Sequence, residues 1–279
     1  MFVLRLNCED RPGIVAAVAT VLSNNQCNIE EAAHFFDPLS GQFFMRVVYR
    51  PLQDGCGESF AARFEEIARD FEMKYRICDL SQPVRMAVMV SRFDHCLNDL
   101  LYRWRTRTLP VEITCVISNH KDAEKLVSDH GLPFHVLPVE AKTKAEQKEN
   151  VAQILQQTET ELIVLARYMQ VLSEDFCTKN KGRIINIHHS FLPGFKGAKP
   201  YTQAYERGVK IIGATAHFVT PDLDEGPIIA QGVQDVTHAD TPAMMQAKGR
   251  DTESRVLARA IELYAQRRIF LQGQRTIIL

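Results

Sequence analysis

The chain has few of the features that mark secreted or membrane proteins. Its seven cysteines are an odd number, and none is close enough to another to form a CxxC metal or redox pair, so a disulfide framework is not expected. No apolar stretch approaches the roughly 18 residues that a membrane helix needs. The N-terminus reaches Arg5 and then Glu9 too soon for a signal-peptide core. These absences predict a cytoplasmic protein with reduced thiols.

The chain also has no excess of charge of one sign. It contains 33 Lys and Arg against 34 Asp and Glu, a formal net charge of −1 at pH 7. The densest basic run, Arg103–Arg107, is short and is better explained as the exposed end of a helix. We therefore expect no nucleic acid and no membrane among the partners.

The 279 residues correspond to just under two domains, at about 150 residues per domain. The first 80 residues have strand and helix patterns in the order βαββαβ, which predicts a ferredoxin-like sandwich with two helices on one face of an antiparallel sheet. The strands are expected at 2–7, 28–36, 42–50 and 73–79, and the helices at 13–24 and around 60–71.

A different pattern follows the expected linker at 79–83. Near-continuous apolar strands alternate with helices, which predicts a mostly parallel sheet covered on both faces. The strands are expected at 84–90, 111–117, 134–137, 161–165 and 183–187, with two more between 211 and 236, and the helices at 95–105, 121–130, 143–157 and 241–268. The predicted domains are therefore 1–80 and 84–279, both of the α/β class.

Polar side chains gather where two strands of the second domain end. In open parallel sheets, ligands bind outside the carboxyl ends of the strands. One such end is 186–190, which runs into 192–197, and the other is 215–219, followed by 222–227. Together they offer an amide, three imidazoles and three carboxylates, which can polarise a carbonyl group and move a proton.

Strand alternation sorts these candidates. Asn186 and His188 are two residues apart, so they face one side of the sheet and can converge on one substrate atom, while His189 faces the other. Asp224 precedes Gly226, in a loop from which a carboxylate can approach a pocket from above.

Each candidate also has a purely structural explanation. An Asn or His at a strand end is often a satisfied structural group, and an Asp in a loop is often a turn residue. A zinc site from His188, His189 and His217 is disfavoured, because alternation sends the adjacent pair to opposite faces. Ser190 lacks the G-x-S-x-G elbow of a nucleophile, and nothing activates Cys177. Spacing alone predicts only a polar cleft of hydrolase or transferase type.

Several separated motifs resemble the folate-dependent formyltransferase fold, which glycinamide ribonucleotide and methionyl-tRNA formyltransferases share. They occur in the order of that family over residues 84–279 and comprise Asn186-Ile187-His188, Leu192-Pro193-Gly194-Phe195-Lys196-Gly197, His217-Phe218-Val219 and Asp224-Glu225-Gly226-Pro227-Ile228-Ile229. The segment 166–172 is similar to the family stretch that borders the pterin ring. The resemblance implies a Rossmann-like catalytic domain.

The same resemblance implies the roles of the site residues. It makes Asp224, His188 and Asn186 the catalytic residues. It assigns substrate binding to Met169, Gln170, Val171, Leu172, His217, Val219 and Asp222. It implies no metal and no cofactor, because the folate is the substrate.

Residues 2–79 resemble an ACT domain, with Asp10–Gly13 at its first strand–helix turn. An ACT domain before such a catalytic domain is the arrangement of the formyltetrahydrofolate deformylases, which cleave 10-formyltetrahydrofolate to formate and tetrahydrofolate. The ACT resemblance implies a homo-oligomer, a dimer or tetramer, with an amino-acid effector. The alternative is that residues 1–80 serve only assembly, since fold analogy is a weak functional warrant.

Two departures from the transferases favour water as the formyl acceptor. The transferases hold the acceptor's phosphate on a glycine-rich loop, where backbone N–H groups form a nest. Here the corresponding loop, 91–97, has no glycine and carries Phe93 and Asp94. In addition, His189 stands where the transferases have proline. A transferase with an unrecognised amine pocket is the alternative, and a regulatory protein without catalysis is a third, against which the intact catalytic set counts.

The expected mechanism gives each catalytic residue one task. His188 and the Asn186 amide stabilise the oxyanion, and Asp224 acts as the general base. Burial would raise the pKa of Asp224, whereas a protonated His188 nearby would lower it. Since a base must be ionised, we expect His188 and Asp224 to lie close together. His189 either orients His188 or fills the core.

Overall fold

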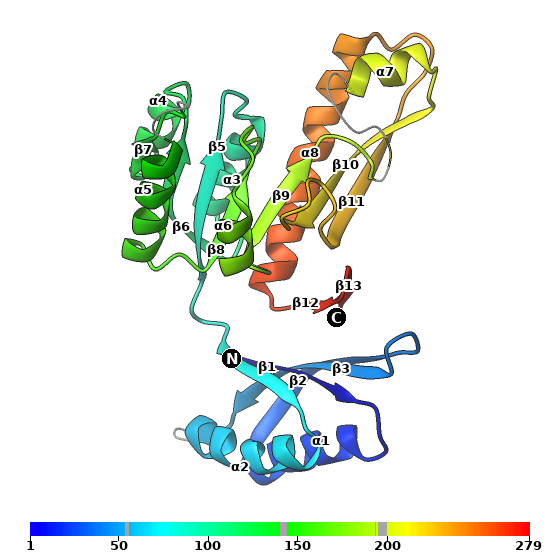
Figure 1. Cartoon of the computed structure of the whole chain (residues 1–279). Coiled ribbons are helices and arrows are strands. Elements are labelled where there is room, and N and C mark those ends of the chain that lie inside the picture. Colours follow the sequence, from blue (N-terminus) through cyan, green and yellow to red (C-terminus); the bar gives the residue numbers. More distant parts are fainter. Residues whose placement is uncertain (54–55, 140–143, 193, 195–199) are drawn as a thin grey trace. The chain divides into compact units, whose positions relative to one another are not determined.

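The computed structural model spans the chain and describes residues 1–53, 56–139, 144–192, 194 and 200–279. It divides into two compact units (Figure 1). The first comprises Met1–Gln82, Gln266–Phe270 and Ile277–Leu279, and the second Pro83–Ala265 and Leu271–Thr276. Among the described residues, no helix has both the length and the apolar character that crossing a membrane requires.

The first unit is a four-stranded antiparallel sheet with two helices on one face, which confirms the predicted βαββαβ order (Figure 1). The strand order is β2-β3-β1-β4. Alternate residues of β1, Leu4 and Leu6, pack with Val18 of α1 and Phe60 of α2 in the apolar core. The elements are β1 (Phe2–Glu9), α1 (Ile14–Asn24), β2 (Cys27–Asp37), β3 (Gln42–Pro51), α2 (Cys56–Asp70) and β4 (Lys74–Asp79).

C-terminal residues complete the first unit. Arg46 of β3 is only 2% exposed, and its Nε donates to the carbonyl oxygen of Gln266 at 3.1 Å. Phe270 packs edge-on against Phe44, with ring centroids 5.6 Å apart. The predicted domain range 84–279 did not anticipate this packing, because long-range contacts leave no local sequence pattern.

The second unit is built on a seven-stranded sheet in the order β11-β10-β9-β8-β5-β6-β7. The pairs among β5 to β9 are parallel, and β10 is antiparallel to both its neighbours, so the sheet is mostly parallel, as predicted. Its strands are β5 (Val84–Val90), β6 (Val111–Ser118), β7 (Phe134–Val136), β8 (Leu162–Leu165), β9 (Ile184–His188), β10 (Ile211–Phe218) and β11 (Ile228–Asp235). Its helices are α3 (His95–Arg105), α4 (Glu124–Ser128), α5 (Lys144–Gln157), α6 (Glu174–Lys179), α7 (Pro200–Glu206) and α8 (Pro242–Ala265).

The C-terminal region differs from the expectation. The helix predicted over 241–268 ends at Ala265, and Arg267 has a left-handed backbone with a φ of 59°. Two short strands, β12 (Ile269–Gln272) and β13 (Arg275–Ile278), follow and pair with each other. A left-handed residue ends a helix, but arginine gives no sequence signal for that conformation.

The sequence analysis placed the polar segments 186–190 and 215–219 together because both end strands of a parallel sheet, and this reason is wrong for 215–219. Because β10 runs antiparallel to β9, its carboxyl end does not lie at the edge where β9 ends. The segments meet through their register instead, which places His217 directly opposite Asn186. Directly opposed residues of an antiparallel pair project from the same face of the sheet.

Candidate active site

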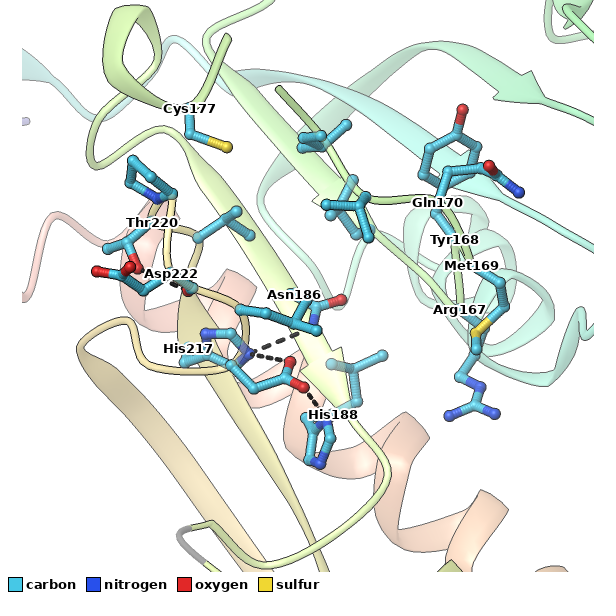
Figure 2. Close-up of a pocket in the computed structure, with 18 of the residues that line it drawn as sticks. Arg167, Tyr168, Met169, Gln170, Cys177, Asn186, His188, His217, Thr220 and Asp222 are labelled. Atoms are coloured by element: carbon cyan, nitrogen blue, oxygen red, sulfur yellow. Dashed lines mark hydrogen bonds and ion pairs between the residues drawn. The ribbon is translucent and has the colours of Figure 1, made fainter. Parts of the chain in front are cut away.

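Strands β9 and β10 position an amide beside an imidazole. The Nδ2 atom of Asn186 lies 3.2 Å from Nε2 of His217. The other ring nitrogen, Nδ1, lies 2.8 Å from the carbonyl oxygen of Phe218, to which it must donate, since a carbonyl only accepts. His217 is therefore held with Nε2 toward Asn186 (Figure 2).

The turn between β10 and β11 carries Asp224 to the same place. Asp224 has a left-handed backbone with a φ of 57°. Gly226 follows, and a Cβ at this position would overlap the carbonyl oxygen of Phe218. Only glycine allows the turn to approach β10 this closely. The turn is anchored there by the N–H of Phe218, which donates to the carbonyl oxygen of Pro227 at 2.9 Å.

The Asp224 carboxylate lies between two imidazoles. Its Oδ2 is 3.2 Å from Nδ1 of His188, and its Oδ1 is 3.6 Å from Nε2 of His217. The three residues come from two strands and a turn, and the expected proximity of His188 and Asp224 is present.

These contacts set the charge of the carboxylate. Hydrogen bonding from His188, and then from His217, holds the pKa of Asp224 well below its usual value, although burial acts in the opposite direction. The sequence analysis named two opposing effects on the pKa of Asp224, burial and a neighbouring histidine. The histidine has the larger effect. Asp224 is ionised across the neutral range and is able to accept a proton.

His188 has one ring nitrogen paired and one without a partner. The residue is 7% exposed, and its Nε2 is buried with no hydrogen-bond partner among the described residues. Such groups are rare in folded proteins and require an explanation. His188 also lines a cavity, so its ring is placed to meet a group bound there.

The cavity has a volume of about 290 Å³. All residues assigned to the site from the sequence line it, namely Asn186, His188, His217, Asp224, Met169, Gln170, Val171, Leu172, Val219 and Asp222. Asn186, His188 and Asp224 form one polar group in its lining, and apolar residues such as Leu165 and Leu172 contribute elsewhere. Met169 and Val171 are 58% and 65% exposed, so the cavity is open on their side.

Ser91 fixes the segment 166–172, which borders this cavity. Its N–H donates to the carbonyl oxygen of Arg167 at 3.3 Å, and its Oγ accepts from the N–H of Met169 at 3.0 Å. The hydroxyl in turn donates to Oδ1 of Asn119 at 2.7 Å. Sequence analysis did not assign this role, although a small polar residue directly after a buried strand was the available signal.

His189 directly follows β9 and lines the same cavity as His188, and its ring contacts that of His188. The two rings meet edge to face, with centroids 5.1 Å apart. Burial lowers the pKa of His189 to about 4, and the charges of Arg167 and His188 add to this effect. The ring is therefore neutral at physiological pH. Both the orienting and the core-filling role are compatible with this contact.

A second polar cluster was missed by the sequence analysis. Glu253 of α8 is only 1% exposed, and its carboxylate lies 2.8 Å from Nε2 of His95 and 3.5 Å from Nε of Arg167. Tyr201 donates its hydroxyl to it at 3.0 Å. The available signal was a glutamate on the apolar face of α8, four residues before Leu257.

Part of the predicted motif 192–197 lies outside the described residues, namely 193 and 195–197. Leu192 is buried, and its N–H donates to Oγ1 of Thr215 at 3.0 Å. The beginning of the motif is thus tied to β10.

Comparison with known families agrees with this architecture. A family described as "Formyl transferase" matches residues 84–261, and one described as "ACT domain" matches residues 2–51. The fold and the site thus define a formyltransferase-type domain that follows an ACT domain.

Individual relatives show to which family of formyltransferase-type proteins the chain belongs. A protein from Corynebacterium sp. (strain P-1) named formyltetrahydrofolate deformylase is 44% identical, and the match covers 99% of this chain and 97% of that one. The crystal structure of formyltetrahydrofolate deformylase from Burkholderia mallei is 47% identical, with a TM-score of 0.95 over 100% of this chain and 99% of that chain. The chain belongs to the formyltetrahydrofolate deformylase family.

A transferase is a more distant match. Glycinamide ribonucleotide transformylase 1 from Symbiobacterium toebii is 32% identical, with a TM-score of 0.67 over 71% of this chain and 94% of that one.

Proposed function

We propose that this protein hydrolyses 10-formyltetrahydrofolate to formate and tetrahydrofolate. The observation that carries the proposal is the buried, unpaired Nε2 of His188, beside an ionised Asp224, in the lining of an open cavity. The names of the relatives from Corynebacterium and Burkholderia support the same reaction.

The folate ring system occupies the cavity bordered by the segment 169–172. Ser91 fixes the main chain of this segment. The side chains of Met169, Val171 and Leu172, together with Val219, form the apolar wall of the cavity. His217 and Asp222 lie at the same cavity. This arrangement supports the binding of a flat ring whose N10-formyl group reaches the catalytic residues. The catalytic set requires no metal and no further cofactor.

His188 and Asn186 stabilise the charge that develops on the formyl oxygen. His188 presents Nδ1 to Asp224, 3.2 Å away, so Nε2 is the ring nitrogen that is left to donate to the oxyanion. The Asn186 amide faces the same cavity. Loss of one such donor typically costs about 3 kcal/mol of transition-state stabilisation.

Asp224 accepts a proton from the attacking water. Its lowered pKa makes it a weak base, but the water becomes strongly acidic once its oxygen bonds to the formyl carbon, so a carboxylate suffices. The same proton then goes to N10 as the bond between the formyl carbon and N10 breaks. The products are tetrahydrofolate and formic acid, which loses its proton at neutral pH.

The loop 91–97 supports water rather than an amine ribonucleotide as the acceptor, because it has no glycine to form a phosphate nest and carries Phe93 and Asp94. The likeness to a glycinamide ribonucleotide transformylase supports formyl transfer to an amine as the second candidate.

The ACT domain supports a regulated assembly. Its match to residues 2–51 supports an amino-acid effector and a homo-oligomer, a dimer or tetramer. Six of the seven cysteines, namely Cys8, Cys27, Cys78, Cys96, Cys115 and Cys177, are thiols outside any disulfide, which supports a location in the reducing cytoplasm.

Formate assays with and without an amine acceptor test the proposal. Purified protein is incubated with 10-formyltetrahydrofolate alone and, in parallel, with added glycinamide ribonucleotide. Hydrolysis predicts formate in both mixtures at the same rate, with no formylated ribonucleotide. Formyl transfer that occurs only when the amine is present would contradict it and favour the second candidate.

A further inference from the structure

A second cavity, of about 350 Å³, lies beside the folate cavity in the second unit. Arg167 and His189 line both cavities, so these two side chains form the shared wall. Phe93, Arg250 and Glu253 contribute to the remaining walls. In Figure 2 the guanidinium of Arg167 and the amide of Gln170 extend in opposite directions from the same segment.

Two guanidinium groups gather in this second cavity. Those of Arg167 and Arg250 lie 5.6 and 5.5 Å from the ring centroid of Phe93. Two like charges near one ring repel each other, and an anion bound between them would reduce this repulsion. The aromatic ring offsets part of this cost through cation–π attraction.

The carboxylate already present neutralises only one of the two arginines. Glu253 lies 3.5 Å from Nε of Arg167 and also accepts from Tyr201. Among the described residues, no carboxylate lies within ion-pair distance of Arg250. Among the arginine and carboxylate side chains of the described lining, one positive charge is therefore in excess.

The Arg167 side chain is only 10% exposed, so its guanidinium is largely removed from water. Its contact with Glu253, 3.5 Å from Nε, is long for a charge-assisted hydrogen bond, so a further anion in the cavity would stabilise this charge.

We propose that this cavity, which we call the arginine cavity, binds the formate that the reaction produces. The proposal rests on the proposed function, since hydrolysis creates one small monoanion at the wall that both cavities share. A monoanion matches the single excess charge, and the planar carboxylate of formate matches the donor fork of a guanidinium. Formate leaves the formyl position toward Arg167 and Arg250, while tetrahydrofolate occupies the other cavity.

Binding of ¹³C-labelled formate to the free protein, followed by NMR line broadening, tests this inference without any turnover. The test variant is Arg250→Gln, and the control is Arg255→Gln, which removes an exposed arginine from the same helix. We expect Arg250→Gln to raise the dissociation constant of formate about tenfold or more, while the control binds like the native protein. Arg250→Lys, which keeps the charge without the fork, should give an intermediate value.

Two results would overturn the inference. One is native formate binding by a folded Arg250→Gln variant, with folding checked by circular dichroism. The other is displacement of formate by N-acetylglutamate at lower concentration than by acetate, which would assign the cavity to a larger carboxylate such as the glutamate tail of the substrate. Arg250-dependent formate binding without hydrolysis of 10-formyltetrahydrofolate would refute the proposed function and leave the anion site standing.

Discussion

The carboxylate of Asp224 holds the catalytic group together at the scale of single residues. It is the only one of the three proposed catalytic residues that lies on a turn, and it contacts the imidazoles of both His188 and His217. Because these contacts lower its pKa, the carboxylate is ionised across the neutral range and is available there as a base.

Replacement of Asp224 by Asn tests its catalytic role. The variant keeps the shape of the side chain but cannot accept a proton, so kcat should fall by about 10²–10⁴ while folate still binds. Steady-state rates and a folate-binding titration measure the two effects. Glu225→Gln, an exposed neighbour in the same turn, is the matched control. Activity of Asp224→Asn within tenfold of the native rate would remove Asp224 from this role.

His189 makes stability depend on pH in a defined direction. Its pKa falls from 6.5 to about 4 on folding, so the unfolded chain binds the proton more readily between these values. Its contribution is fully present above pH 6.5 and decreases as the pH falls toward 4, by at most about 1.4 kcal/mol per pH unit.

Urea unfolding between pH 4.5 and 7.5 measures this dependence. We expect the slope of unfolding free energy against pH to be smaller in His189→Gln than in the native protein. An identical slope in the two proteins would show that His189 takes up its proton equally well in the folded state.

At the scale of elements, the turn between β10 and β11 determines where Asp224 lies. Its close approach to β10 depends on Gly226, whose hydrogen faces the carbonyl oxygen of Phe218. The pairing of β10 with β11 is also irregular between Ala216 and His217, and such bulges often re-aim side chains at sites.

Replacement of Gly226 by Ala tests the turn. The added methyl forces the turn away from β10, which separates Asp224 from His188 and should reduce kcat at least 100-fold, by analogy with other misplaced catalytic groups. Gly208→Ala is the control, because Gly208 also has a positive φ, 62°, but open space around it. It should lose about 1 kcal/mol of stability and keep native kcat. Equal activity of the two variants would contradict this account.

The sequence predicted the elements well where their pattern is local. The apolar strands and amphipathic helices of both units lie where the periodicity indicates, because burial of one face is encoded in each segment. The direction of β10 could not be predicted, since pairing depends on register across the sheet. The Glu253 cluster and the contacts of Ser91 with Arg167 and Met169 join distant segments of the chain. Such contacts leave only one signal in the sequence, a polar residue in an apolar context.

At the scale of the whole molecule, the chain returns at its C-terminus to the unit in which it began. Arg46 of β3 connects the segment after α8 with β2, since its Nε donates to the carbonyl oxygen of Gln266 and its Nη1 lies 3.0 Å from Oε2 of Glu31. Arg268 approaches the other oxygen of Glu31 at 2.8 Å. Glu31 is thus shared between an arginine of β3 and one that follows α8.

Arg46→Met tests the importance of this network. The substitution removes the hydrogen bond to the carbonyl oxygen of Gln266 and one of the two arginines that contact Glu31. Loss of a hydrogen bond from a charged donor typically costs about 1.5–3 kcal/mol. Thermal unfolding should show a lower midpoint for Arg46→Met than for Arg50→Met, which removes an exposed arginine of the same strand paired with Glu30. Equal midpoints would mean that the C-terminal segment adds little to the first unit.

The source of the oxygen in the product tests the central claim most directly. When 10-formyltetrahydrofolate is turned over in H₂¹⁸O, the account predicts that each formate carries one ¹⁸O atom, that tetrahydrofolate forms in equal amount, and that no amine is needed. Formate without ¹⁸O, or tetrahydrofolate formed only when an amine acceptor is supplied, would contradict it.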